Sequence, residues 1–146
     1  MKYLLDTCIV SELANRNPNP GVIAWLENQR SDDLFISVLT VGELEKGITK
    51  LGSGGRVAAL RKWLEQDISG SFADRILPVT DEISRQWGRI SGRSELGGLK
   101  RPVVDSLLAA TASVHDLTLV TRNVRDMTGT GVPVFNPFSD HSRPTA

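Results

Sequence analysis

Apolar residues occur in two patterns along this chain: short continuous runs, and longer stretches with an apolar residue at every third or fourth position. A short apolar run between polar or turn residues predicts a buried strand. Five segments have this pattern: residues 2–5, 34–38, 75–79, 117–121 and 132–135. Pro78 predicts that the third of these strands lies at or near a sheet edge, because proline cannot donate to a strand ladder.

The spaced pattern predicts amphipathic helices between the strands. These helices are expected to begin at about residue 11, to cover 22–29, 40–51 and 56–71, to begin again at Thr80 or Asp81, and finally near Pro102. Strands that alternate with helices are joined by right-handed crossovers and pair in parallel. The sequence therefore predicts an α/β fold, a three-layer α/β/α sandwich with a mainly parallel central sheet.

Length and composition fit one globular domain. With 146 residues, 40% of them apolar, the chain can bury a core of its own, and we place a single domain at 1–138 and a disordered tail at 139–146. No segment approaches the roughly 20 apolar residues of a membrane span, and the first residues lack the form of a signal peptide, so a cytoplasmic protein without a membrane partner is expected. The single cysteine, Cys8, excludes an internal disulfide and a multi-cysteine zinc site.

Net charge is zero, with 17 basic and 17 acidic residues, which does not suggest a nucleic-acid partner by itself. Three arginines nevertheless recur every four residues, Arg85, Arg89 and Arg93, and Lys100 and Arg101 follow. A solvated helix face is the simpler interpretation of this stripe, and contact with nucleic acid is the alternative.

Three acids stand in apolar surroundings: Asp6 ends the first predicted strand, while Glu43 and Asp105 lie within apolar helical stretches. Ionised acids seldom lie in such surroundings unless a cation or hydrogen bonds compensate them, so the three acids suggest one shared cation. Because no histidine or cysteine cluster accompanies them, the ion indicated is Mg²⁺, with Mn²⁺ as a substitute, rather than zinc. Asp6 and the turn at 121–126 both follow strands at the carboxyl edge of the predicted sheet, where open α/β sheets bind ligands.

Each acid also has a structural interpretation. Glu43 stands three residues after Thr40, the spacing of a capping box. Asp105 is favoured near the positive end of its helix whatever its function. For Asp6, neither a cap nor a salt bridge is evident from the sequence.

Four blocks of the sequence, at residues 4–7, 37–44, 105–112 and 119–126, together with the closing run 134–137, resemble the PIN-domain ribonucleases. Within that family the chain is most similar to the VapC- and FitB-type toxins of type II toxin–antitoxin pairs. The resemblance implies the α/β/α fold already predicted, an acidic Mg²⁺ pocket, and Asp6, Glu43 and Asp105 as both catalytic residues and metal ligands.

The family's fourth acidic position falls in the 121–126 turn, where Asn123 takes the equivalent place and Asp126 is the nearest carboxylate, so both are expected to be catalytic candidates. A second departure is Cys8, where many relatives have asparagine. As substrate contacts we predict Thr7, Thr121 and, from the basic stripe, Arg85 and Arg89.

The function predicted from this resemblance is that of a Mg²⁺-dependent endoribonuclease in which a metal-activated water hydrolyses RNA phosphodiester bonds. Expected partners are RNA, a small VapB- or FitA-like antitoxin, operator DNA bound through that antitoxin, and a second copy in a homodimer. The alternative is a PIN-fold binding module that acts mainly in the operator DNA complex with little turnover. A phosphatase of the haloacid dehalogenase type also begins with an aspartate after a strand, but it needs an acid two residues later, where this chain has Cys8.

Overall fold

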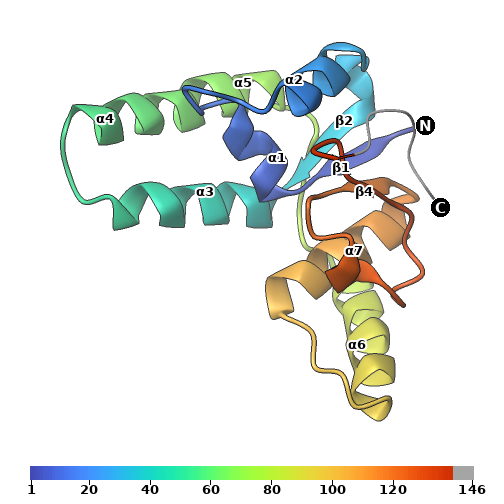
Figure 1. Ribbon diagram of the computed structural model, residues 1–146. Helices are drawn as coiled ribbons and strands as arrows, with labels where there is room; N and C mark the ends of the chain where they lie inside the picture. Colours follow the sequence, from blue (N-terminus) through green and yellow to red (C-terminus); the bar gives the residue numbers. More distant parts are fainter. Residues whose placement is uncertain (140–146) are drawn as a thin grey trace.

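The structure, a computed structural model, describes residues 1–139 and is built on a parallel sheet (Figure 1). The strands are β1 (Tyr3–Leu5), β2 (Leu34–Ser37), β3 (Ile76–Leu77), β4 (Thr118–Val120) and β5 (Val134–Phe135). Their order is β3-β2-β1-β4-β5, and all four neighbouring pairs are parallel. All five predicted strands are present, and β3 lies at an edge, as Pro78 predicted. The predicted tail lies, after Ser139, outside the described residues.

The helices occupy the segments between the strands. They are α1 (Thr7–Glu12), α2 (Pro20–Glu27), η1 (Ser31–Asp33), α3 (Val38–Lys50), α4 (Gly55–Lys62), η2 (Trp63–Ile68), α5 (Ser69–Ser71), α6 (Asp81–Leu96), α7 (Val103–His115) and η3 (Arg125–Met127). The helix predicted over 56–71 is present as α4, a π-helical turn η2 and α5. Two boundaries were wrong: α1 begins at Thr7 rather than near Ser11, and Pro102 precedes α7 as its N-cap instead of lying in its first turn.

Side chains along β1 alternate between the two faces of the sheet, and each face carries one half of the core. Tyr3 and Leu5 pack with Trp25 and with residues of α1, α3 and η2, whereas Leu4 packs with residues of α6 and α7. Successive side chains of a strand point to opposite faces, so a single three-residue strand contributes to both halves. The predicted three-layer α/β/α sandwich is confirmed.

Two helical arms extend from the sheet in Figure 1: one contains α3 and the α4–α5 helix, and the other contains α6 and α7. A hydrogen bond from the Trp87 indole nitrogen to Ser106 Oγ, 2.9 Å long, joins α6 to α7. Within the described part of the chain, every helix is too short or too polar to cross a membrane.

Candidate active site

Asp6 follows β1 directly and is 5% exposed. Its Oδ1 accepts a 2.7 Å hydrogen bond from the Thr7 backbone N–H, and its Oδ2 accepts one of 2.7 Å from the Thr121 hydroxyl, which comes from the end of β4. Asp6 is thus the N-cap of α1, a structural role that the sequence did not reveal. The cap explains the early start of α1, and it also fixes the direction of the carboxylate.

Glu43 lies on α3, in the second turn of the helix that follows β2, and is partly buried. Its Oε1 accepts a 2.5 Å hydrogen bond from the Thr7 hydroxyl, so Thr7 donates to both Asp6 and Glu43. The capping-box interpretation of Glu43 is wrong, because the cap of α3 is Ser37, whose Oγ accepts from the Leu39 N–H at 3.0 Å.

Asp105 lies in the first turn of α7. Because α7 runs antiparallel to the strand that follows it, its first turn lies at the carboxyl edge of the sheet, near Asp6. The pKa of Asp105 is raised above its ordinary value, first by burial and then by the negative charges of Asp6, Asp126 and Glu43. The charges of Asp6, Asp126 and Glu43, which come from three other segments of the chain, therefore act on the Asp105 carboxylate.

The loop after β4 contains both candidates for the fourth position. The Asn123 backbone N–H donates to Thr121 Oγ1 at 3.0 Å, and Asp126 lies in the short helix η3. Both side chains are exposed. Asp126 is the one whose charge acts on Asp105.

The donor chemistry of this cluster fits a hard divalent cation. Its ligands are carboxylate oxygens, which suit Mg²⁺ or Mn²⁺, and repulsion among the acids is relieved by positive charge. Within residues 1–139, no three Asp, Glu, His or Cys side chains already stand close enough to hold an ion by themselves. Magnesium usually keeps several of its waters and takes one or two carboxylates directly, so an open arrangement of acids is compatible with it.

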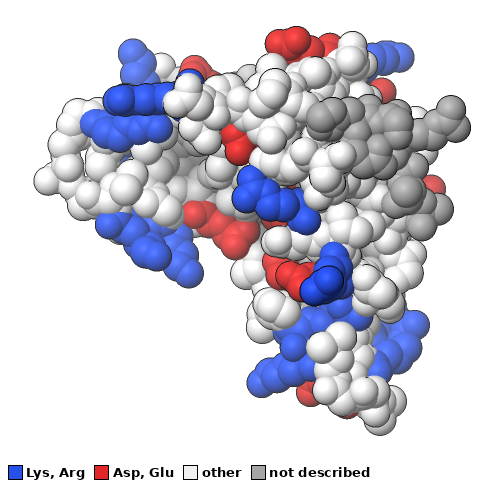
Figure 2. Space-filling view, viewed as in Figure 1, with Lys and Arg blue, Asp and Glu red and all other residues white. Residues whose placement is uncertain are grey.

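The residues predicted to contact substrate differ in where the structure places them. Thr7 and Thr121 lie at the acids and use their hydroxyls to hold Glu43 and Asp6. Arg85 and Arg89 are exposed on α6 and contact residues of their own helix: Arg85 pairs with Asp81 at 2.8 Å, and Arg89 donates to Gln86. Basic side chains do gather over the α6 arm, and acidic side chains lie in the hollow between the two arms (Figure 2).

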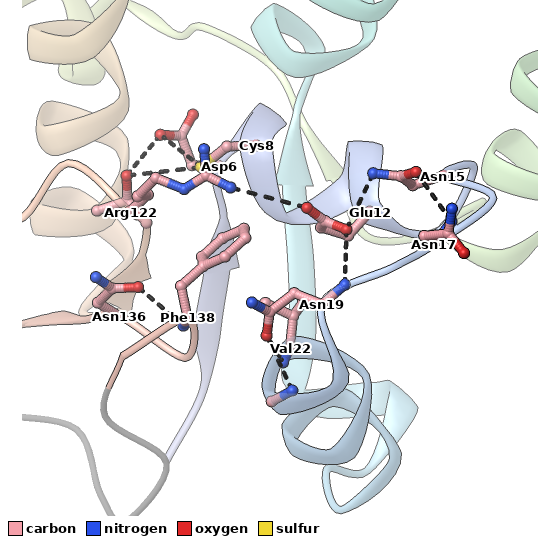
Figure 3. A network of polar contacts seen from close by, with 12 residues as sticks. Asp6, Cys8, Glu12, Asn15, Asn17, Asn19, Val22, Arg122, Asn136 and Phe138 are labelled. Carbon is pink, nitrogen blue, oxygen red and sulfur yellow. Dashed lines mark hydrogen bonds and ion pairs between the residues drawn. The ribbon is translucent and has the colours of Figure 1, made fainter.

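Sequence reasoning missed a charged network next to Asp6, shown in Figure 3. Arg122 follows Thr121, stacks over the Phe138 ring with 3.9 Å between its Cζ and the ring centroid, and forms a 3.8 Å ion pair with Glu12. Glu12 is only 9% exposed and also accepts from the Asn19 backbone N–H at 3.0 Å. A positive charge is therefore held beside the acids, and only the position of Arg122 in the 121–126 turn hinted at it.

Cys8 contacts the same carboxylate as Thr121. Its thiol donates to Asp6 Oδ2 across 3.8 Å, a much weaker contact than the hydroxyl of Thr121 makes. Burial, and then the charge of Asp6, raises the pKa of Cys8. A raised pKa favours the neutral thiol over the thiolate.

A groove of about 280 Å³ opens beside Glu43, between α1, α3 and α4. Thr7 and Glu43 lie at one part of it, and apolar residues such as Ile48, Leu60 and Trp63 line the rest. The groove is thus a mainly apolar surface with Glu43 in its lining.

The parallel α/β/α fold, with Asp6 at the end of β1, Glu43 on α3, Asp105 on α7 and Asp126 on η3, is the setting for the comparison with known proteins. The sequence profile of the PIN domain matches residues 3–127. The chain belongs to the PIN domain family.

Two relatives are similar over nearly the whole chain. Toxin FitB of Neisseria gonorrhoeae is 36% identical over 137 residues, covering 94% of this chain and 99% of its own. The VapC ribonuclease Y4jK of Sinorhizobium fredii is 30% identical, covering 92% of this chain and 96% of its own.

Two solved structures are similar to the chain over nearly its whole length. FitAB bound to a DNA fragment has a TM-score of 0.89 at 33% identity and covers 97% of this chain and 99% of its own. FitAcB from Neisseria gonorrhoeae also has a TM-score of 0.89, at 36% identity over 94% of this chain and 99% of its own.

Proposed function

We propose that this chain is the toxin of a type II toxin–antitoxin pair and acts as a Mg²⁺-dependent endoribonuclease. The observation that carries the proposal is the convergence of acids from distant segments: Thr7 bonds to both Asp6 and Glu43, Thr121 bonds to Asp6, and the charges of Asp6, Asp126 and Glu43 act on Asp105. A divalent cation would be stabilised among these negative charges. Relatives named as a toxin and as a VapC ribonuclease support the same activity.

Asp6, Glu43 and Asp105 would hold the cation in this proposal, with Asp126 or Asn123 at the fourth position. A bound Mg²⁺ supplies an activated water and neutralises charge on the phosphoryl oxygens. The chain's own residues orient the ligands: Thr121 and the Thr7 backbone hold Asp6, and the Thr7 hydroxyl holds Glu43. Fixed ligands reduce the reorganisation needed when the cation and an RNA phosphate bind.

The proposed partners are RNA as substrate and an antitoxin as inhibitor. The groove beside Glu43 supports the antitoxin, because an apolar antitoxin segment lying in it would contact Glu43. Operator DNA would be bound through the antitoxin, by analogy with the FitAB complex on DNA. The proposal includes a homodimer, for which exposed apolar residues around the α6–α7 connection, Leu96, Leu99 and Val103, offer a surface.

The test is cleavage of single-stranded RNA by the purified protein with Mg²⁺, compared with Asp105→Asn and with excess chelator. The expected result is cleavage by the wild type that both treatments abolish. A matched control is Asp116→Asn, which neutralises an acid at the opposite end of the same helix and leaves cleavage intact.

Cleavage that persists in excess chelator, or in Asp105→Asn, contradicts the proposed mechanism. A wild type that cleaves no RNA but joins an antitoxin on operator DNA favours the alternative, a PIN-fold binding module. The similarity of the chain to the DNA-bound FitAB structure is the observation that favours this second candidate.

A further inference from the structure

Arg101, in the connection between α6 and α7, joins two segments that are distant in sequence. Its Nη1 donates to the Asp126 backbone carbonyl and its Nη2 to the Thr128 carbonyl, both at 2.7 Å. Its Nε donates to Ser94 Oγ on α6 at 2.8 Å. Three short bonds from one guanidinium, each assisted by its charge, make a strong and directional link.

Both ends of this link are themselves fixed. Ser94 Oγ donates to the Ile90 carbonyl of α6 at 2.9 Å, which ties the anchor to a long helix. On the loop side, the backbone passes so close that a Cβ on Gly129, where φ is +86°, would lie 3.2 Å from Arg101 Nη2. The loop that follows η3 is therefore shaped around the guanidinium.

The position of the Asp126 side chain depends on this link more than the positions of the other acids do. Within the described chain its carboxylate has no hydrogen bond, and its side chain is exposed, so its position follows that of its backbone. Arg101 holds the carbonyl of that same residue.

We propose that Arg101 is a positioning residue, which holds the η3 loop so that the Asp126 carboxylate stays beside Asp105. It does not touch the cation or the substrate but acts through Asp126. The importance of this position for metal binding rests on the proposed function, whereas the hold on the loop does not.

Arginine is required here by geometry. Its planar fork sends two parallel N–H groups to two carbonyls while Nε donates to a third partner, and a lysine ammonium on a flexible stem does not reproduce this arrangement. Arg101→Lys is therefore expected to behave like Arg101→Gln.

The experiment measures Mn²⁺ and Mg²⁺ binding to the full chain by calorimetry, without RNA. Arg101→Gln is expected to raise the dissociation constant about tenfold, the effect typical of losing a group that orients a ligand. The matched control is Arg93→Gln. Arg93 and Arg101 both line a cavity of about 280 Å³, but within the described residues the Arg93 Nε donates only to the Arg89 carbonyl of its own helix. This control is expected to bind metal as the wild type does.

A double-mutant cycle identifies the route of the effect. If Arg101 acts through Asp126, then Arg101→Gln adds no further loss of metal affinity to Asp126→Asn. Independent, multiplicative losses overturn the proposal, as does unchanged metal affinity in Arg101→Gln.

A second measurement is independent of metal: amide hydrogen exchange of residues 126–130 in the metal-free protein. The amides of Asp126, Met127, Thr128 and Thr130 bond to carbonyls three residues earlier, and their exchange is expected to quicken in Arg101→Gln but not in Arg93→Gln. Unchanged exchange overturns the role of Arg101. If the wild type binds no divalent ion, the proposed function fails, and the exchange result alone decides whether Arg101 holds the loop.

Discussion

The four acids of the candidate site form two pairs that differ in their hydrogen bonds. Asp6 and Glu43, the hydroxyl-held acids, accept hydrogen bonds from Thr121, which follows β4, and from Thr7, at the start of α1. Asp105 and Asp126, the repelling acids, have carboxylates without hydrogen bonds within the described chain, and the pKa of Asp105 is raised by burial and by its acidic neighbours.

The comparison separates two tasks of a metal site. In the proposed metal site, the hydroxyl-held acids would supply ligand geometry, because their hydrogen bonds orient them without a cation. The repelling acids would supply part of the driving force for binding, because a cation relieves the unfavourable charge around Asp105.

The largest effect is expected from Asp6→Asn. The amide removes a negative charge, and its NH₂ group would face either the Thr7 N–H or the Thr121 hydroxyl, both of which donate to Asp6. RNA cleavage should fall at least ~100-fold, the scale of losing one electrostatic group at a reaction centre. Single-turnover cleavage measures this loss, and retention of wild-type activity would show that Asp6 is only a helix cap.

The next effect tests the hydroxyl that holds Asp6. Thr121→Val removes a 2.7 Å hydrogen bond from a buried carboxylate and should weaken metal binding ~10-fold. It should also lower the free energy of unfolding by about 1–3 kcal/mol, the cost of a buried polar group without its partner. Thr121→Ser keeps the hydroxyl and is the control for metal affinity by calorimetry; equal losses in both variants would assign the effect to packing.

A third prediction concerns the repelling acids and pH. Because the pKa of Asp105 is raised, this carboxyl takes up a proton at a higher pH than an ordinary aspartate does, and a proton competes with the cation. Metal affinity measured by calorimetry should therefore fall as pH decreases, beginning above the range of a normal aspartate. In Asp105→Asn the affinity is lower at neutral pH but should lose this early fall; an identical pH profile would contradict the assignment.

The smallest effect is on the stability of the metal-free protein. A raised folded-state pKa means that the folded chain binds the Asp105 proton more tightly than the unfolded chain, so ionisation destabilises the fold above that pKa. Asp105→Asn should raise the melting temperature in chelator at pH 7 by about 1–2 °C, a small value because Asp105 is partly exposed and solvent screens its charge.

The stabilisation by Asp105→Asn is expected to depend on pH. The stabilisation should disappear below pH ~4, where Asp105 is protonated in both the folded and the unfolded chain. Asp116→Asn, at the other end of α7, should show no such pH dependence. Destabilisation by Asp105→Asn in chelator would contradict the repulsion between these acids.

Much of the fold followed from the order of apolar runs. All five strands and the parallel sheet were predicted, because a short apolar run between amphipathic helices has few other stable arrangements. The boundary of α1 was not predicted, because Cys8, Ile9 and Val10 continue the apolar pattern of β1. Only the hydrogen bond from the Thr7 N–H to Asp6 marks the place where the strand ends and the helix begins.

The residues of the candidate site likewise fall into those that the sequence predicted and those that only the structure revealed. Asp6, Glu43 and Asp105 could be proposed from the sequence because a charged residue among apolar residues is a local signal. Glu12, Arg122 and Arg101 were not recognised as parts of the site, since a charged residue on a helix or in a loop is ordinary until its partner is known. The partner of Arg122 is Glu12, and those of Arg101 are the carbonyls of Asp126 and Thr128.

By itself, then, the sequence determined the layers, the strand direction and the edge of the sheet at which acids gather, because these follow from periodicity and from the handedness of connections. Tertiary structure decided which group holds which acid. The Thr7 hydroxyl reaches Glu43 across 36 positions of the chain, and the Thr121 hydroxyl reaches Asp6 across 115. Hydrogen bonds depend on distances of a few ångströms, and only folding brings residues so far apart in sequence to within that range.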